Sequence, residues 1–400
     1  MKKELASFLC LVLGIFTLLV SCDHLEPQGP EEDQLLDGPL EGLTNAQSKQ
    51  FLDGDIAFND EVFTSDSGLG PIFVATSCAS CHIGDGKGHP FTTLTRFGQS
   101  EPGANAFLNQ GGPQLQNRAI PGFEPENIPP GATFSNFTPP AITGLGFLEL
   151  VSDEDILAMA DPDDEDNDGI SGVPNWIEPP SFVTLFPNAI AQDGKYIHRF
   201  GKKAAAYNLL HQTINAYNQD IGITSIQNPI DVFSGQEIEP EVDQNTVNDV
   251  VFYLQTLKAP IQRDQNDDEV VQGQNLFGQI NCAACHKPTL RTGFSPVQVL
   301  SEVNFHPYTD LLLHDMGPDL DDGYTEGSAE TSEWRTPPLW GLGLSPNSQG
   351  EQFFLMHDGR ARSIEEAILM HGGEAANSRQ QYENLSETEK EALIRFLKSL

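Results

Sequence analysis

Cys78-Ala-Ser-Cys81-His82 and Cys282-Ala-Ala-Cys285-His286 are two copies of one pentapeptide, C-x-x-C-H, in a chain of 400 residues. This pattern is the attachment signal of c-type haem. The two thiols add to the haem vinyl groups, and the imidazole that follows becomes an axial iron ligand. Disulfides or a zinc site are the alternatives, but zinc needs four converging ligands, and neither explains the His after the second Cys. The sequence therefore predicts two covalent haems, bound through Cys78, Cys81, His82, Cys282, Cys285 and His286.

The N-terminus is typical of an exported lipoprotein. A positive start precedes an apolar run over 6–20, which has signal-peptide length and is too short for a membrane span. Residues 19–22 (LVSC) resemble a bacterial lipobox, which predicts a signal peptide over 1–21 and lipidation of Cys22. Ordinary cleavage that leaves this thiol free is the alternative. Residues 22–43 lack Lys and Arg and predict a flexible tether. We expect a protein that faces the periplasm or the cell surface and is lipid-anchored to a bacterial membrane.

Charge and composition restrict the function classes. The chain has 58 acidic and 21 basic residues, a net charge of −37, which argues against nucleic-acid binding. This charge favours a cationic redox partner, although a solvated acidic surface explains it equally well. Apolar residues make up 38%, and 36 Gly and 28 Pro are present. We therefore expect a mainly α fold with long Gly/Pro-rich loops, in which two haems supply much of the core.

An internal repeat precedes the two motifs. Each motif follows a predicted helix with the pattern apolar-x-x-Gly-x-x-x-Phe, namely Phe51, Gly54 and Phe58, then Val270, Gly273 and Phe277. Capping patterns place the start of the first helix at Thr44 and of the second at Asn266. The repeat predicts two cytochrome c-like domains, an N-terminal one with insertions over 44–260 and a C-terminal one over 261–400.

Other elements are expected from periodicity and composition. A C-terminal helix capped at Ser386 is the expected packing partner of the second pre-motif helix. Residues 202–217 and 247–257 also have helical patterns, and residues 99–140 are rich in Gly, Pro, Asn and Gln and predict a long loop.

Longer stretches resemble one bacterial family, the di-haem c-type oxidoreductases, also called thiol oxidoreductases, which is related to the di-haem cytochrome c peroxidases. The matching stretches are Ser77–His82, Asp85–Gly88, Pro139–Gly146, Asp164–Gly172, Arg199–Gly201, Asp310–Gly317, Arg335–Gly343 and His357–Ala361. The resemblance implies two cytochrome c-like domains, with a low-potential catalytic haem coupled to a high-potential one. It also implies reduction of hydrogen peroxide with electrons from a small donor, a cytochrome or a cupredoxin. A non-catalytic electron-transfer cytochrome and an oxidase of another macromolecule are the alternatives.

Two positions depart from the related families. The chain lacks the Phe-Trp-Asp-Gly-Arg stretch that supplies an inter-haem Trp in the peroxidases. Trp340 could bridge the haems instead, but a buried core Trp is the simpler interpretation. Lys202 stands where the family usually has Trp, directly after Arg199–Gly201.

The sixth iron ligands decide the chemistry of each haem, because a Met ligand gives a high-potential electron carrier and an open position admits peroxide. Met316 is the first candidate for the second haem, by family pattern, and Met356 is the alternative. The alternative for each is a packing residue. His89 is the nearest candidate for the first haem, and further His candidates are His198, His314 and His357.

Three further roles need polar residues. Glu149, in an otherwise apolar run, is the candidate for moving a proton during peroxide cleavage, because burial would raise its pKa. The candidates for binding haem propionates are the scarce arginines Arg199, Arg335, Arg360 and Arg362. Asp164, Asp166 and Asp168 resemble the start of a calcium loop, although the EF-hand pattern is incomplete.

Overall fold

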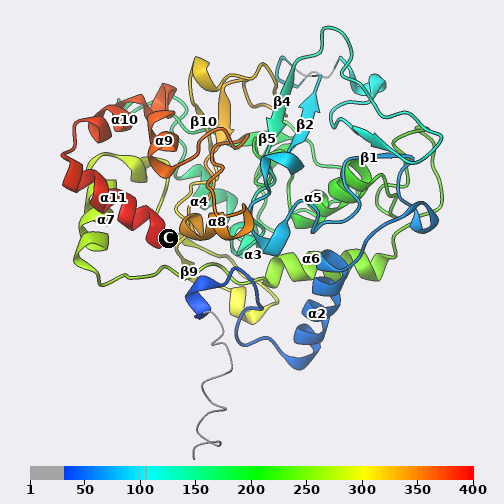
Figure 1. Ribbon diagram of the computed structural model, residues 1–400, viewed down its shortest axis with the longest axis horizontal. Coiled ribbons are helices and arrows are strands. Elements are labelled where there is room, and N and C mark those ends of the chain that lie inside the picture. The colour runs from blue at the N-terminus through cyan, green and yellow to red at the C-terminus, as the bar shows by residue number, and fades with distance from the viewer. Residues whose placement is uncertain (1–30, 99, 104–105) are drawn as a thin grey trace, which may run out of the picture. The chain divides into compact units, whose positions relative to one another are not determined.

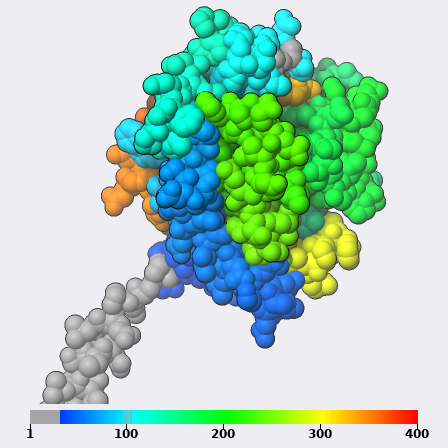
Figure 2. All heavy atoms as spheres, turned by 90° about the vertical axis from the view of Figure 1, so that its right-hand side faces the viewer, coloured from blue at the N-terminus to red at the C-terminus, as the bar shows by residue number. Residues whose placement is uncertain are grey.

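Two pairs of packed helices flank the two C-x-x-C-H motifs. In the computed structural model, which describes residues 31–98, 100–103 and 106–400, α2 packs on α6 and α7 packs on α11. Figure 1 shows each pair lying together, and in Figure 2 the blue residues of the first pair lie beside the yellow-green ones on one face. The α-helices are α2 (Asn45–Asn59), α3 (Leu145–Glu149), α4 (Asp153–Leu157), α5 (Leu209–Asn215), α6 (Gln244–Thr256), α7 (Asp268–Gln279), α8 (Ser345–Ser348), α9 (Ile364–Leu369), α10 (Ala376–Glu383) and α11 (Glu387–Ser399).

Capping side chains fix where the paired helices begin. Thr44 and Ser386 form the expected capping boxes of α2 and α11. Each side chain accepts a hydrogen bond from the backbone N–H of the residue three positions later, Gln47 or Glu389, whose side chain in turn accepts from the backbone N–H of the cap. The cap of α7 is Asp267 and not Asn266, because the Asp267 carboxylate accepts hydrogen bonds from the backbone N–H of Glu269 and of Val270.

Glycine allows both pairs to pack closely. A Cβ atom at Gly54 would lie 2.1 Å from the carbonyl oxygen of Asp249 on α6. A Cβ atom at Gly273 would lie 2.1 Å from the carbonyl oxygen of Ala392 on α11. The predicted reason for the repeated glycine, close approach to a partner helix, is therefore confirmed in both halves.

A second repeat, which the sequence analysis missed, follows each motif. Pro139–Gly146 and Pro337–Gly343 both begin with Pro-Pro and end with Gly-Leu-Gly. The last glycine of each lies on the C-terminal turn of α6 or α11, where an added Cβ atom would be 1.9 Å from a carbonyl oxygen, that of Gln255 or of Lys398. The same four pieces thus occur in the same order around each motif: helix, motif, Gly-Leu-Gly turn and terminal helix.

The strands are short and form small sheets of two or three strands. All pairings among the described strands are antiparallel: β1 with β3, β2 with β4, β5 and β6 with β7, β8 with β9, and β10 with β11. Their bounds are β1 Ile72–Phe73, β2 Leu94–Phe97, β3 Arg118–Ala119, β4 Phe134–Phe137, β5 Asn175–Ile177, β6 Ala191–Gln192, β7 Lys195–His198, β8 Leu290–Arg291, β9 Asn304–Phe305, β10 Leu313–Asp315 and β11 Glu333–Arg335. Helices are therefore the main regular structure, as the composition predicted.

Two local predictions need correction. The helix expected over 202–217 begins only at α5, after an Asn208 cap, and continues as a π-helix, η6 (Ala216–Ile221). The expected loop over 99–140 contains β3 and β4. These segments pair with β1 and β2, which satisfies their backbone hydrogen bonds. The Gly- and Pro-rich composition did not indicate this pairing.

The contacts divide the chain after Leu35. The first unit contains, in its described part, a short 3-10 helix, Glu32–Gln34, and residues 36–400 form one compact unit. A boundary between cytochrome c-like domains at 260/261 stays a prediction. The signal peptide and Cys22 lie outside the described residues, and among those described no helix is long and apolar enough to cross a membrane.

Candidate haem cavity

Both motifs open into one cavity of about 470 Å³. The cavity wall is largely apolar and includes the Cys and His side chains of both motifs, namely Cys78, Cys81, His82, Cys282, Cys285 and His286. All four cysteines are free thiols in the described structure, so the disulfide alternative is not realised. A large apolar cavity with a few polar groups is typical of cofactor sites.

The hydrogen bonds and burial of the motif histidines suit the predicted role of iron ligand. His82 Nδ1 donates to the carbonyl oxygen of Pro140 at 2.9 Å, and His286 Nδ1 donates to that of Tyr308 at 3.0 Å. A proton held on Nδ1 leaves Nε2 as the free donor atom, as at most protein metal sites. Burial lowers the pKa of both imidazoles to about 4, which keeps them neutral. Thiols and ligand-ready imidazoles in one apolar cavity therefore fit two covalently bound haems.

The repeated phenylalanines pack beside these histidines. The ring centroid of Phe58 on α2 lies 5.9 Å from that of His82, and the ring centroid of Phe277 on α7 lies 6.3 Å from that of His286. The helix before each motif therefore supplies an aromatic side chain next to the motif histidine. This equivalence extends the repeat from the helices to the site.

Both candidate methionines reach the cavity. Met316 and Met356 line its wall, beside Trp334. Met356 also belongs to the apolar cluster that contains Cys282 of the second motif, whereas Met316 does not. The packing therefore favours Met356 over Met316 as the neighbour of the second haem, although the choice of ligand stays a prediction.

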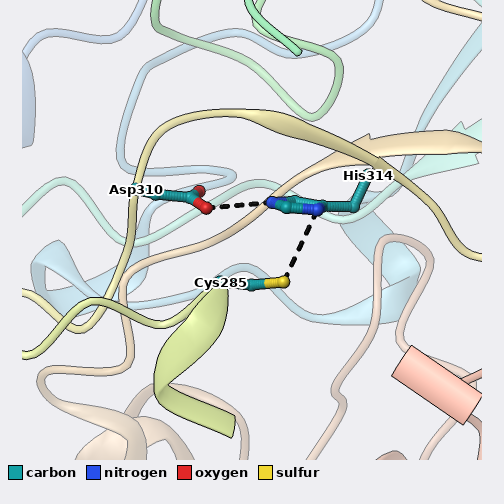
Figure 3. Close-up of side chains that lie close together, drawn as sticks. All are labelled: Cys285, Asp310 and His314. Carbon is teal, nitrogen blue, oxygen red and sulfur yellow. Dashed lines mark hydrogen bonds and ion pairs between the residues drawn. The ribbon is translucent and has the colours of Figure 1, made fainter. Parts of the chain in front are cut away.

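His314 is occupied by carboxylates. Its Nε2 lies 2.9 Å from Asp310 Oδ2 and its Nδ1 lies 2.6 Å from Glu374 Oε2, while Cys285 Sγ is 3.5 Å from Nδ1 (Figure 3). Burial acts to lower the pKa of His314, but the hydrogen bonds, led by that to Asp310, hold it well above its usual range. A charged imidazole with both nitrogens engaged does not offer a lone pair to iron. Cys285, Asp310 and His314 lie close enough to hold a metal ion, but Cys285 belongs to the second C-x-x-C-H motif and is predicted to attach haem.

The other histidine candidates differ in position. His89 and His198 do not line the cavity. His357 lines it, but its Nε2 lies 2.7 Å from Asp322 Oδ2 and its ring stacks on Trp334 with centroids 3.7 Å apart. His371, which the sequence analysis did not single out, lines the cavity with its Nδ1 bonded to Ala367 O at 2.7 Å.

Glu149 lies outside the cavity wall. Its Oε1 accepts from the backbone N–H of Leu209 at 2.7 Å, and its Oε2 accepts from Gln255 Nε2 at 2.7 Å. Burial raises its pKa, as expected, and these hydrogen bonds oppose the shift. The carboxylate ties α3 to α5 and α6, and the structure does not bring it to either motif.

Asp220 is the acidic side chain that sequence reasoning missed at the first motif. It lines the cavity from η6, and burial raises its pKa to about 7, opposed by Arg96. Burial raises the pKa of the Cys78 and Cys81 thiols to about 12, and the charge of Asp220 adds to that shift. Asp220, Cys78 and Cys81 line the same cavity. Its sequence signal was weak, because nothing before folding shows that this turn faces the motif.

Cations line the same cavity. Arg335 lines it, as expected, but Arg199, Arg360 and Arg362 do not. Arg199 pairs with buried Asp153, Arg360 pairs with Asp322 and Asp358, and Arg362 lies over the ring of Phe354. The further cations in the wall are Lys87, Arg96, Lys202 and Arg379.

The carboxylates that cluster in the acidic loop over 161–168 are not all those expected for the calcium site. Asp161, Asp164 and Asp166 present carboxylate oxygens within 4.8 Å of one another. Asp168 instead accepts from the backbone N–H of Ile170 at 2.9 Å. Calcium binding at this loop stays a prediction.

Trp340 is a buried side chain that also lines the cavity. It belongs to the largest apolar cluster, with its ring centroid 5.9 Å from that of Phe305. Its packing agrees with the core interpretation, and its role in electron transfer is untested.

Comparison with known proteins identifies the family to which this chain belongs. A family model described as "Di-haem oxidoreductase, putative peroxidase" matches residues 134–400, a range that includes the second motif and not the first. No curated protein matches the sequence significantly. Two solved structures are similar over 94% of this chain and 95% of theirs, each with a TM-score of 0.40: Kuenenia stuttgartiensis hydrazine synthase pressurized with xenon, at 16% identity, and a MauG-like protein associated with microbial copper homeostasis, at 13%. Likeness at this level carries no argument about fold or function.

Proposed function

Since this chain belongs to the di-haem oxidoreductase family, we propose that it reduces hydrogen peroxide to water, with electrons from a small redox donor. Reduction of one peroxide consumes two electrons and two protons and yields two waters. When bound, two haems supply one stored electron each. The protein must then bind peroxide, exclude other reactions and move protons.

The observation that carries this proposal is the polar group at the first motif. Asp220 lines the cavity, and its charge acts on the thiols of Cys78 and Cys81. Tyr217 on the same π-helix also lines the cavity, with a buried hydroxyl that has no hydrogen-bond partner among the described residues. π-helical turns often occur at functional sites. A purely electron-transferring cytochrome has no need of a titratable carboxylate enclosed at its haem.

The chain's own residues can perform the proton transfer. Asp220, in its charged form, can accept a proton from peroxide and return it to the oxygen that leaves as water. Arg96 lies near this carboxylate and donates from Nη1 to Gln219 Oε1 at 2.7 Å, while Glu326 balances its charge at 2.8 Å. The Tyr217 hydroxyl can donate a further hydrogen bond into the cavity. We therefore assign the proton-transfer role first predicted for Glu149 to Asp220.

Substitution of the carboxylate tests this assignment. We expect Asp220→Asn to lower kcat for peroxide reduction by about 10²–10⁴-fold, the usual contribution of general acid–base catalysis, with both haems still attached. Asp193→Asn is the matched control, because this residue is exposed in the turn between β6 and β7. A full rate in Asp220→Asn, or a comparable loss only in Glu149→Gln, contradicts the assignment.

The remaining expectations belong to the same proposal. The protein would be exported, lipid-anchored at Cys22 and fed by a cationic cytochrome or cupredoxin, without nucleic-acid partners. The charge of −37 supports the kind of donor. Calcium bound by Asp161, Asp164 and Asp166 would stabilise the conformation of this acidic loop. The loop also contacts a distant part of the chain, because Ser171 Oγ donates to Glu374 Oε1 at 2.6 Å.

A further inference from the structure

Three cations from distant parts of the chain meet in the wall of the haem cavity. They are Lys87, five residues after His82, Lys202, four residues after β7, and Arg335 at the end of β11. The backbone N–H of Arg335 donates to Lys202 O at 3.0 Å, and Arg335 Nε donates to Gly201 O at 2.9 Å. The charges of Lys87 and Arg335 both act on the ammonium group of Lys202. The three therefore form one group, here called the cation cluster.

No salt bridge joins Lys87, Lys202 or Arg335 to a carboxylate in the described chain. Neither the Lys87 nor the Lys202 ammonium group has a hydrogen-bond partner within the described chain, and Asp358 is the carboxylate whose charge acts on Lys202. Burial lowers the pKa of Lys87 to about 8 and that of Lys202 to about 7, with Lys87 and Arg335 adding to the latter shift. Burial also lowers the pKa of Arg335 to about 10.

Other enclosed cations of this chain are compensated differently. The Lys203 ammonium group donates to three backbone carbonyls, at 2.6–3.1 Å. Arg96 pairs with Glu326 and Arg199 with Asp153. Enclosing a cation without an ion pair is costly, and only 21 basic residues occur in the chain. Three half-buried cations without a salt bridge in one cavity therefore indicate an anionic ligand.

The cation cluster shares its cavity with both motifs and interacts with charged or titratable groups of each. The charge of Lys202 acts on His82 of the first motif. The charge of Asp310 acts on Arg335, and Asp310 also bonds His314 beside Cys285 of the second motif. An anion held here would therefore lie in the cavity that both motifs line.

We propose that Lys87, Lys202 and Arg335 bind the propionate carboxylates of both haems, so that the propionate edges of the haems meet at this cluster. The inference rests on the two covalent haems of the proposed function but not on peroxide as substrate. Each haem brings two carboxylates, and a guanidinium can hold one of them in a bidentate pair. Lys202 contributes a compact ammonium charge from the wall of the same cavity.

The cation cluster then tunes the redox chemistry. A nearby positive charge favours the reduced haem, because reduction adds an electron to the site. Removal of one ammonium group should therefore lower the reduction potential of the neighbouring haem. The first haem should respond most to Lys87 and Lys202, which lie on the side of its motif.

Spectroelectrochemical titration of the full holoprotein tests this inference. We expect Lys202→Met and Lys87→Met to lower the reduction constant of at least one haem by about tenfold, which is about 59 mV for one electron, with two haems per chain retained. Lys202→Arg keeps the positive charge and should therefore keep most of the wild-type reduction potential. Lys195→Met, at an exposed lysine of β7 outside the cavity wall, is the matched control.

Two results would overturn the inference. The first is that replacing Lys87 or Lys202 changes neither haem potential more than Lys195→Met does. The second is a dependence of the wild-type potentials on added acetate at constant ionic strength, because it would show that the cluster is open to external carboxylates. A shifted potential without peroxide turnover would instead leave the cation cluster assigned and refute peroxide as the substrate.

Discussion

Asp220 is the residue on which the proposed chemistry depends most. Its carboxylate lines the cavity of the first motif and acts on the Cys81 thiol, and the charge of Arg96 acts on it in turn. Burial raises its pKa to about 7, so both protonation states are accessible near neutral pH. A carboxylate of this kind can accept and return a proton within one turnover.

We therefore expect the peroxide reduction rate to rise with pH through about 7 and then level off, because only the charged form of Asp220 accepts a proton. Initial rates at fixed ionic strength measure this profile. Asp220→Asn should remove the inflection while Asp193→Asn keeps it. An inflection that survives in Asp220→Asn would show that another group titrates.

Residues whose chemistry depends on local spacing could be predicted from sequence, and those placed by tertiary packing could not. The thiols and imidazoles of both motifs line the cavity as expected. Glu149 fails as a cavity residue because its apolar neighbours bury it at a helix junction. Asp220, Lys87 and Lys202 reach the cavity only after segments far apart in the chain come together.

At the scale of elements, the glycine-mediated contact of each pre-motif helix supports the site. Gly54 on α2 and Gly273 on α7 have equivalent environments, and the phenylalanine four residues after each glycine packs beside the motif histidine. Moving either helix outward would therefore displace the wall of a haem site.

Two alanine substitutions on one helix separate this contact from helix propensity. Gly273→Ala should destabilise the holoprotein by about 1–3 kcal/mol, the usual cost of overpacking, because its Cβ atom would meet the backbone of Ala392. Gly278→Ala, also on α7, has open space and should be neutral or stabilising by up to about 1 kcal/mol. Urea unfolding measures both, and equal effects would refute the packing role.

The helix pairs were predictable because capping boxes and apolar spacing are local signals. The repeated Pro-Pro and Gly-Leu-Gly segments were equally visible in the sequence, and comparing the residues after each motif would have found them. The start of α5 was misplaced because the residues before Asn208 form turns that tie to β11, where Arg335 N donates to Lys202 O at 3.0 Å.

At the scale of the whole molecule, the charge of −37 is the dominant feature. A field of this sign attracts cationic partners and repels anionic ones, and salt screens it over about 8 Å at physiological ionic strength. The cation cluster in the interior therefore contrasts with the acidic character of the chain.

Donor kinetics should reflect this field. The second-order rate constant with a cationic cytochrome should fall by at least about tenfold between low and high salt, because screening removes electrostatic steering. An uncharged reductant is the control and should show little change. Stopped-flow traces over a salt series measure the effect, and equal salt responses for the two donors would contradict a cationic partner.

The central claim, that two haems deliver electrons to peroxide at a site served by Asp220, is tested most directly by anaerobic titration of the fully reduced holoprotein with hydrogen peroxide. The account predicts that one peroxide oxidises both haems of a chain, and that Asp220→Asn slows the oxidation without changing this ratio. Haems that stay reduced after a full equivalent of peroxide would contradict the account.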